Sequence, residues 1–135
     1  MRLPVVFRYA GLVLILNAGF LLISSGISWA YGDSALLPLL YSTIVAALFG
    51  VFPVLFVPSS NDISEKEGFA IVVMSWLLSC MVGMIPFFFW GGQFSLTNAW
   101  FESVSGFTTT GSSILMNIEI LPRGLLFFLC PGRPR

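Results

Sequence analysis

Three long apolar runs dominate the pattern of hydrophobic and polar positions along the chain. They occupy residues 5–29, 35–57 and 68–90, and polar residues gather in the short segments between them. A helix needs about 20 predominantly apolar residues to cross the hydrocarbon core of a bilayer. Each run meets that length, so the pattern predicts three transmembrane helices.

The sequence after the third run is half polar and too short to span a membrane. Residues 98–104 predict a short amphipathic helix, with Thr97 or Asn98 as its N-cap and Gly106 as its end. Apolar sequence resumes at Ile114. Because non-helical backbone survives at membrane depth only where protein or a water-filled cavity surrounds it, this order indicates a re-entrant hairpin that enters from the outer face and returns to it.

Three basic residues set the expected orientation. Arg2 and Arg8 lie at the start of the chain, and Lys66 lies in the loop between the second and third runs. The positive-inside rule places these residues in the cytoplasm, so we expect a cytoplasmic N-terminus. The same loop contains a helix start, because Ser64 and Glu67 have the spacing of a capping box.

Composition narrows the class of protein. Of the 135 residues 57% are hydrophobic and 9% are charged, whereas about 25% are charged in a typical soluble domain. We therefore expect an all-α integral membrane protein in contact with membrane lipid. The formal net charge is zero, which gives no sign of nucleic-acid binding. The alternative that the first run is a signal peptide is disfavoured, because it exceeds the usual ~7–15 apolar residues.

The stretch SGFTTTGSS, residues 105–113, carries the candidate chemistry. A cation that leaves water must replace its hydration shell, and backbone carbonyl groups can do this without adding fixed charge. Gly111 can adopt positive φ at little cost, which allows the backbone to leave ordinary helix or strand geometry. The hydroxyls of Thr108, Thr109 and Thr110 can coordinate an ion or hold the loop from behind. The negative end of the preceding helix dipole would favour a cation here. An ordinary polar turn between membrane helices is the alternative.

The segment AWFESVSGFTTTGSSIL, residues 99–115, resembles the first pore loop of the Trk/Ktr/HKT potassium transporters, most closely the bacterial Trk membrane subunits. Residues 65–91 are similar to the outer helix of that family's first pore repeat, with a Gly83–x–x–Pro86 end. Residues 118–127 resemble the link into the inner helix. The first two runs resemble the extra helix pair of the bacterial members.

The resemblance implies a potassium-channel-like fold with four helix–pore-loop–helix repeats in one chain. Carried over to this chain, the selectivity-filter strand would be Thr108, Thr109, Thr110 and Gly111, whose backbone carbonyls bind the transported K⁺ without any cofactor. The family implies potassium uptake across the plasma membrane, which is the inner membrane in such bacteria. It also implies a cytosolic nucleotide-binding regulatory subunit and a homodimer partner for the full-length protein.

Three residues of the expected pore helix, Glu102, Ser105 and Gly106, are predicted to support the filter. A carboxylate within the membrane is costly and is a functional candidate by default. We expect Glu102 to accept hydrogen bonds from the loop behind the filter, and direct exposure to ions is the alternative. Glu119 and Arg123 are expected at the outer surface as a solvated pair.

The chain divides into three expected parts. Residues 1–60 form a leading transmembrane helix pair, residues 61–127 an incomplete first pore repeat, and residues 128–135 a divergent or truncated tail. The prolines and arginines of that tail cannot continue a membrane helix. Since the chain has one filter strand of four, we expect a fragment that does not conduct potassium without the remaining pore repeats.

Two rival functions come from other classes. A small accessory membrane protein that regulates a larger transporter would use small residues such as Gly11 and Gly19 for helix contacts. A membrane-embedded enzyme is disfavoured, because the chain lacks histidine and only Glu102 is available as a base for a Ser or Thr nucleophile. Cys80 and Cys130 are both in apolar surroundings and are expected to be buried thiols, with no disulfide or metal site.

Overall fold

The computed structural model describes residues 2–60, 62–92, 94–114, 116 and 120–129. Its helices are α1 (Leu3–Tyr31), α2 (Leu36–Phe56), α3 (Glu65–Trp90), α4 (Leu96–Phe107) and α5 (Arg123–Leu129). The described part of the chain is all-helical, and α1, α2 and α3 are each long and apolar enough to cross a membrane. The prediction of an all-α protein with three membrane-capable helices is therefore confirmed.

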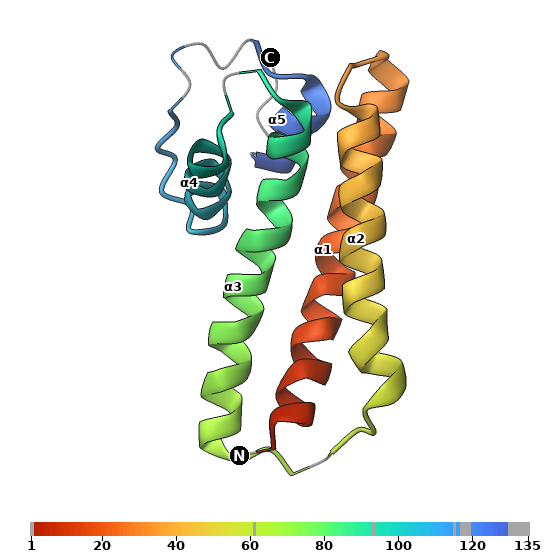
Figure 1. Cartoon of the computed structure of the whole chain (residues 1–135), viewed down its shortest axis with the longest axis vertical. Coiled ribbons are helices and arrows are strands. Elements are labelled where there is room, and N and C mark those ends of the chain that lie inside the picture. The colour runs from red at the N-terminus through yellow and green to blue at the C-terminus, as the bar shows by residue number, and fades with distance from the viewer. Residues whose placement is uncertain (1, 61, 93, 115, 117–119, 130–135) are drawn as a thin grey trace.

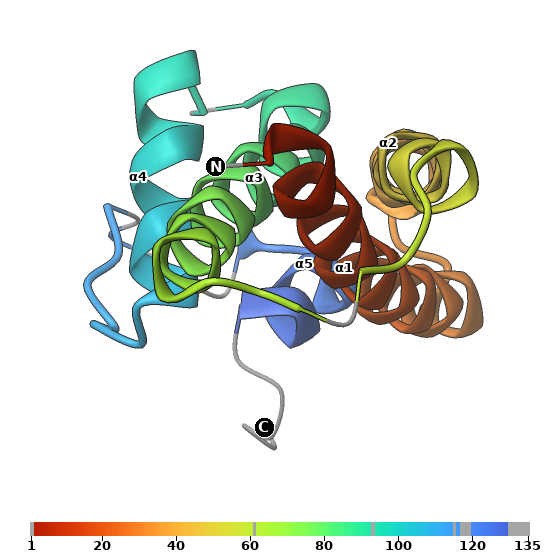
Figure 2. The same cartoon turned by 90° about the horizontal axis from the view of Figure 1, so that it is seen from below.

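The three long helices form a bundle in which α1 packs against both α2 and α3 (Figures 1 and 2). The backbones of α1 and α2 meet where Gly11 faces Gly50. A Cβ atom on Gly11 would lie 2.7 Å from the Gly50 oxygen, and one on Gly50 would lie 2.9 Å from the Gly11 oxygen. Small residues permit such close packing of membrane helices. Gly19, by contrast, has open space beside it and takes no part in this crossing.

A buried hydrogen bond joins α1 to α3. Asn17 Nδ2 donates to Ser79 Oγ over 2.7 Å, and both side chains are buried. In hydrocarbon neither group has water as an alternative partner, so the bond favours one rotation of α1 against α3.

The N-terminal end of the bundle is held by charged groups. Arg2 Nε lies 3.3 Å from Glu67 Oε1 in an ion pair. Glu67 also completes the predicted capping box with Ser64 at the start of α3, which confirms that helix start. The Arg8 guanidinium donates to the carbonyl oxygens of Val54 and Val57, where α2 ends. These bonds satisfy carbonyl groups that have no partner within the helix.

Large apolar side chains cover the outward faces of the long helices. A bilayer explains this exposure, since lipid tails are as apolar as these side chains. Those more than half exposed include Leu16, Leu22, Trp29, Leu37, Leu48, Phe49, Leu55, Phe56, Phe69 and Val72.

The short helix α4 begins and ends at other residues than the sequence predicted. Its N-cap is Ser95, whose hydroxyl accepts a hydrogen bond from the Asn98 backbone, so the choice of Thr97 or Asn98 was wrong. The helix also continues through Gly106 to Phe107, because the Thr108 N–H still bonds to the Val104 carbonyl. Figure 1 shows α4 running back along α3 and the following chain returning to the end from which α4 came.

The last described helix, α5, lies at the same end of the bundle and packs against α1 (Figure 1). It continues through Leu129, two residues beyond the expected boundary between the pore repeat and the tail. Residues 130–135, including Cys130, lie outside the described part of the chain, as does Glu119. Cys80 is a buried free thiol, as expected.

Candidate functional site

The C-terminal half of α4 is held against the interior of α3. Ser103 Oγ donates to the Cys80 carbonyl over 2.7 Å. A Cβ atom on Gly83 would lie 2.5 Å from Phe107 Cε2 and 2.6 Å from Ser103 Oγ, so this approach requires glycine. Gly83 precedes the last residue of α3 by seven positions, which is about 10 Å along a helix. The end of α4 thus lies well inside the length of a membrane-capable helix, as a re-entrant hairpin requires.

The backbone unwinds directly after α4. Gly111 has φ of 70°, in the left-handed region that glycine adopts at little cost, as the sequence predicted. Thr109 also has positive φ, at 55°. Residue type does not predict this conformation, because a β-branched residue in that region is a genuine outlier. Such strain clusters at functional sites.

The threonine hydroxyls hold the unwound segment to the end of α4. Thr108 Oγ1 donates to the Val104 carbonyl over 2.7 Å and lies 2.8 Å from Thr110 Oγ1. The backbone N–H groups of Thr109 and Thr110 donate to the carbonyls of Gly106 and Ser105. Within the described part of the chain, no residue donates a hydrogen bond to the backbone oxygens of residues 108–111.

Two side chains of α4 tie the helix to the segment that follows. Glu102 is buried, with 4% of the residue exposed, and its Oε2 accepts a hydrogen bond from the Ile114 N–H over 3.3 Å. Ser105 Oγ donates to the Ser112 carbonyl over 2.5 Å. Both contacts join α4 to residues that follow residues 108–111 in the chain. The supporting role expected of Glu102 and Ser105 stays a prediction. Gly106 contacts this segment through its carbonyl oxygen, which accepts a hydrogen bond from the Thr109 N–H.

The described residues hold no cluster of three or more His, Cys, Asp or Glu side chains that could bind a metal ion. Arg123 starts α5 at the end of the bundle opposite the N-terminus (Figure 1), and its guanidinium stacks 4.2 Å from the centre of the Tyr31 ring. Its expected partner Glu119 is outside the described residues, so the solvated pair stays a prediction.

Comparison with known proteins gives a consistent result. No family model matches the chain. The Trk system potassium uptake protein TrkH of Escherichia coli K12 is 33% identical over 132 residues, covering 95% of this chain and 27% of the relative. TrkG of the same organism is 35% identical over 72 residues, or 52% of this chain.

The crystal structure of the potassium transporter TrkH from Vibrio parahaemolyticus superimposes with a TM-score of 0.88 at 28% identity. The match covers 96% of this chain and 28% of that chain. The chain thus spans about a quarter of the length of these relatives. These homologues are transporters and not enzymes, which agrees with the sequence analysis. The chain is therefore homologous to TrkH potassium uptake proteins over 95% of its length, and its fold matches the corresponding part of the TrkH structure.

Proposed function

We propose that the chain is part of the membrane subunit of a potassium uptake transporter and supplies one of its four selectivity-filter strands. The strand is Thr108, Thr109, Thr110 and Gly111, and its ligands for K⁺ are backbone carbonyl oxygens. The observation that carries the proposal is the unwound segment after α4, in which no backbone oxygen of residues 108–111 accepts a hydrogen bond from another described residue. Carbonyl rings of this kind replace the hydration shell of potassium in known filters.

The surroundings of the strand support the same function. The C-terminal end of α4 adjoins Thr108, and a helix C-terminus carries about half a negative charge that favours a cation. Glu102 and Ser105 fix the strand from behind through Ile114 and Ser112. Because Glu102 is buried and bonded to the backbone, we assign it a supporting role and not that of an ion ligand.

One strand supplies a quarter of a fourfold coordination shell, so the proposed function needs the other pore repeats. We assign residues 1–60 to a leading helix pair and residues 61–127 to the first repeat, and propose that the chain alone does not transport. In the complete transporter, the proposal includes the bacterial inner membrane, a cytoplasmic N-terminus, a homodimer partner and a cytosolic nucleotide-binding regulatory subunit.

The test uses a chimera in which this chain replaces the aligned quarter of E. coli TrkH. The chimera is expressed in a bacterium that lacks potassium uptake, and growth at low potassium is measured with K⁺ and Na⁺ uptake. We expect rescue by the chimera and loss of K⁺ preference in Gly111→Ala, because alanine at positive φ is strained and the carbonyls would turn. Gly19→Ala is the matched control, since its Cβ meets open space.

Retention of K⁺ preference by Gly111→Ala, at normal abundance in the membrane, would contradict the filter assignment. An accessory protein would behave in that way, because it would tolerate changes in residues 108–111. If the chimera does not accumulate, the equivalent glycine substitution in intact E. coli TrkH provides the same comparison. Growth rescue by the 135-residue chain alone would contradict the requirement for the other repeats.

A further inference from the structure

We propose that the leading helix pair α1–α2 positions the base of the filter, and that Gly124 and Phe128 of α5 are the positioning residues that transmit this contact. The inference deepens the proposed function and rests on it for its transport readout. It assigns a role to the two helices that contribute no filter residue.

The first step is a tight contact between α1 and the start of α5. A Cβ atom on Gly124 would lie 2.7 Å from Ser28 Cβ and 3.0 Å from the Ser24 carbonyl oxygen. The Ser24 hydroxyl also donates to the Gly124 carbonyl. Both serines are completely buried. Any larger residue at position 124 would therefore push α5 away from α1.

The turn between α1 and α2 adds a second contact to the same point. Asp33 Oδ2 accepts a hydrogen bond from the Arg123 N–H over 2.8 Å. The first N–H groups of a helix have no partner within it, so this carboxylate satisfies one of them from outside the helix. The Arg123 guanidinium stacks on Tyr31, at the end of α1.

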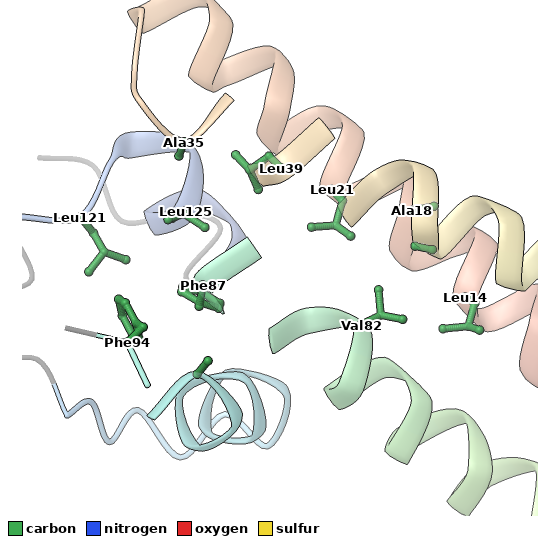
Figure 3. Close-up of a cluster of buried hydrophobic side chains, with 12 residues drawn as sticks. Leu14, Ala18, Leu21, Ala35, Leu39, Val82, Phe87, Phe94, Leu121 and Leu125 are labelled. Carbon is green, nitrogen blue, oxygen red and sulfur yellow. The ribbon is translucent and has the colours of Figure 1, made fainter. Parts of the chain in front are cut away.

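Apolar packing surrounds these polar contacts. Figure 3 shows Leu125 of α5 beside Ala35 and Leu39 of the α2 end, and all three side chains are fully buried. In the same view Leu121, just before α5, lies in the part of the cluster nearest to Phe94. The start of α5 is therefore fixed on several sides by elements that precede the pore loop.

The second step leads from α5 to the filter. Phe128 follows Gly124 by four residues, so the two lie about one helical turn apart. The Phe128 ring meets the Phe107 ring nearly edge-on, with 6.1 Å between ring centres. Phe107 directly precedes Thr108, and its ring is one of the two groups that a Cβ atom on Gly83 would meet. A continuous set of contacts thus runs from α1 through α5 to the residue beneath the filter strand.

The test compares matched pairs of variants in the E. coli chimera. Gly124→Ala is paired with Gly26→Ala, whose Cβ meets open space on α1. Phe128→Ala is paired with Phe127→Ala, because Phe127 is a neighbouring ring that is also half-buried. Uptake of K⁺ and Na⁺ is measured at equal protein abundance in the membrane, with half-saturation concentrations for both ions.

We expect Gly124→Ala and Phe128→Ala to lower the K⁺ to Na⁺ preference by roughly two- to thirty-fold, the range found for residues that couple distant sites. Their control variants should keep the preference of the chimera. A loss of folding alone would lower the amount of transporter and leave the ion preference of the remaining molecules unchanged. Phe128→Tyr keeps the ring and should restore normal preference.

The inference is overturned if Gly124→Ala and Phe128→Ala match their controls while Gly111→Ala loses K⁺ preference. If Gly111→Ala also keeps its preference, the proposed function itself fails, so the two failures are distinguishable. Should either alanine variant fail to accumulate, Phe128→Leu keeps apolar bulk without the ring edge, and Ser24→Ala removes only a hydroxyl. Normal ion preference in both of these would likewise overturn the inference.

Discussion

Replacing Gly83 by alanine tests how α4 is held within the membrane. The new Cβ atom would lie 2.5 Å from Phe107 Cε2 and 2.6 Å from Ser103 Oγ. Neither neighbour can move freely, because Phe107 packs on Phe128 and Ser103 is bonded to the Cys80 carbonyl. Overpacking of this kind costs about 1–3 kcal/mol.

Gly19→Ala is the reference variant for this prediction. Both glycines lie within long helices, so alanine brings a similar gain in helix propensity of about 0.5–1 kcal/mol at each position. Gly19 has nothing within 4 Å of the added Cβ atom. The difference between the stability changes of Gly83→Ala and Gly19→Ala therefore reports the contact of α3 with α4. We expect Gly83→Ala to be less stable than Gly19→Ala by about 1–3 kcal/mol.

The assay is unfolding of the chain in mixed micelles by increasing dodecyl sulfate, followed by tryptophan fluorescence. A double-mutant cycle with Phe107→Ala tests the contribution of the ring. Removing the ring should reduce the loss of stability caused by Gly83→Ala by at least 0.5 kcal/mol, on the order expected for residues in contact. Equal stability of Gly83→Ala and Gly19→Ala would refute the described contact between α3 and α4. An unchanged penalty in the Phe107→Ala background would refute the role of the ring.

Three further predictions use the same unfolding assay. Thr109→Gly should stabilise the chain by about 1–2 kcal/mol, because it removes a β-branched residue from the left-handed backbone conformation. Thr110→Gly should bring no such gain. Equal effects of the two substitutions would contradict the positive φ at Thr109. Ser64→Ala should destabilise it by about 1 kcal/mol through loss of the α3 N-cap, and no change would argue against the capping box. Asn17→Leu and Ser79→Ala should each destabilise the chain by about 0.6–2 kcal/mol. Because one hydrogen bond joins the two side chains, the loss in the double variant should be smaller than the sum of the two single losses. Additive losses would contradict that bond.

The sequence predicts the long helices well because membrane spanning depends on length and hydropathy, which are local properties. The start of α3 is equally local, since Ser64 and Glu67 are three residues apart. The start of α4 was mispredicted because Ser95, Thr97 and Asn98 are all good capping residues. Their side-chain chemistry does not decide among them, and Ser95, the first of the three, is the N-cap.

The backbone conformation of residues 108–111 was predicted only in part. Positive φ at Gly111 follows from residue type, but positive φ at Thr109 runs against it. That conformation depends on neighbouring hydrogen bonds, such as the one from Thr110 N–H to the Ser105 carbonyl. The contact of Gly124 with α1 joins residues about 100 positions apart, and no pattern along the chain indicates it.

The central claim is that the backbone carbonyls of residues 108–111 bind a dehydrated potassium ion. A structure of the TrkH chimera determined with Rb⁺ in place of K⁺ tests it most directly, because anomalous scattering locates Rb⁺ without ambiguity. We predict an anomalous peak on the pore axis within coordination distance of carbonyl oxygens between Thr108 and Gly111. A structure with these carbonyls turned away from the axis, and with Rb⁺ bound elsewhere in the pore, would contradict the claim.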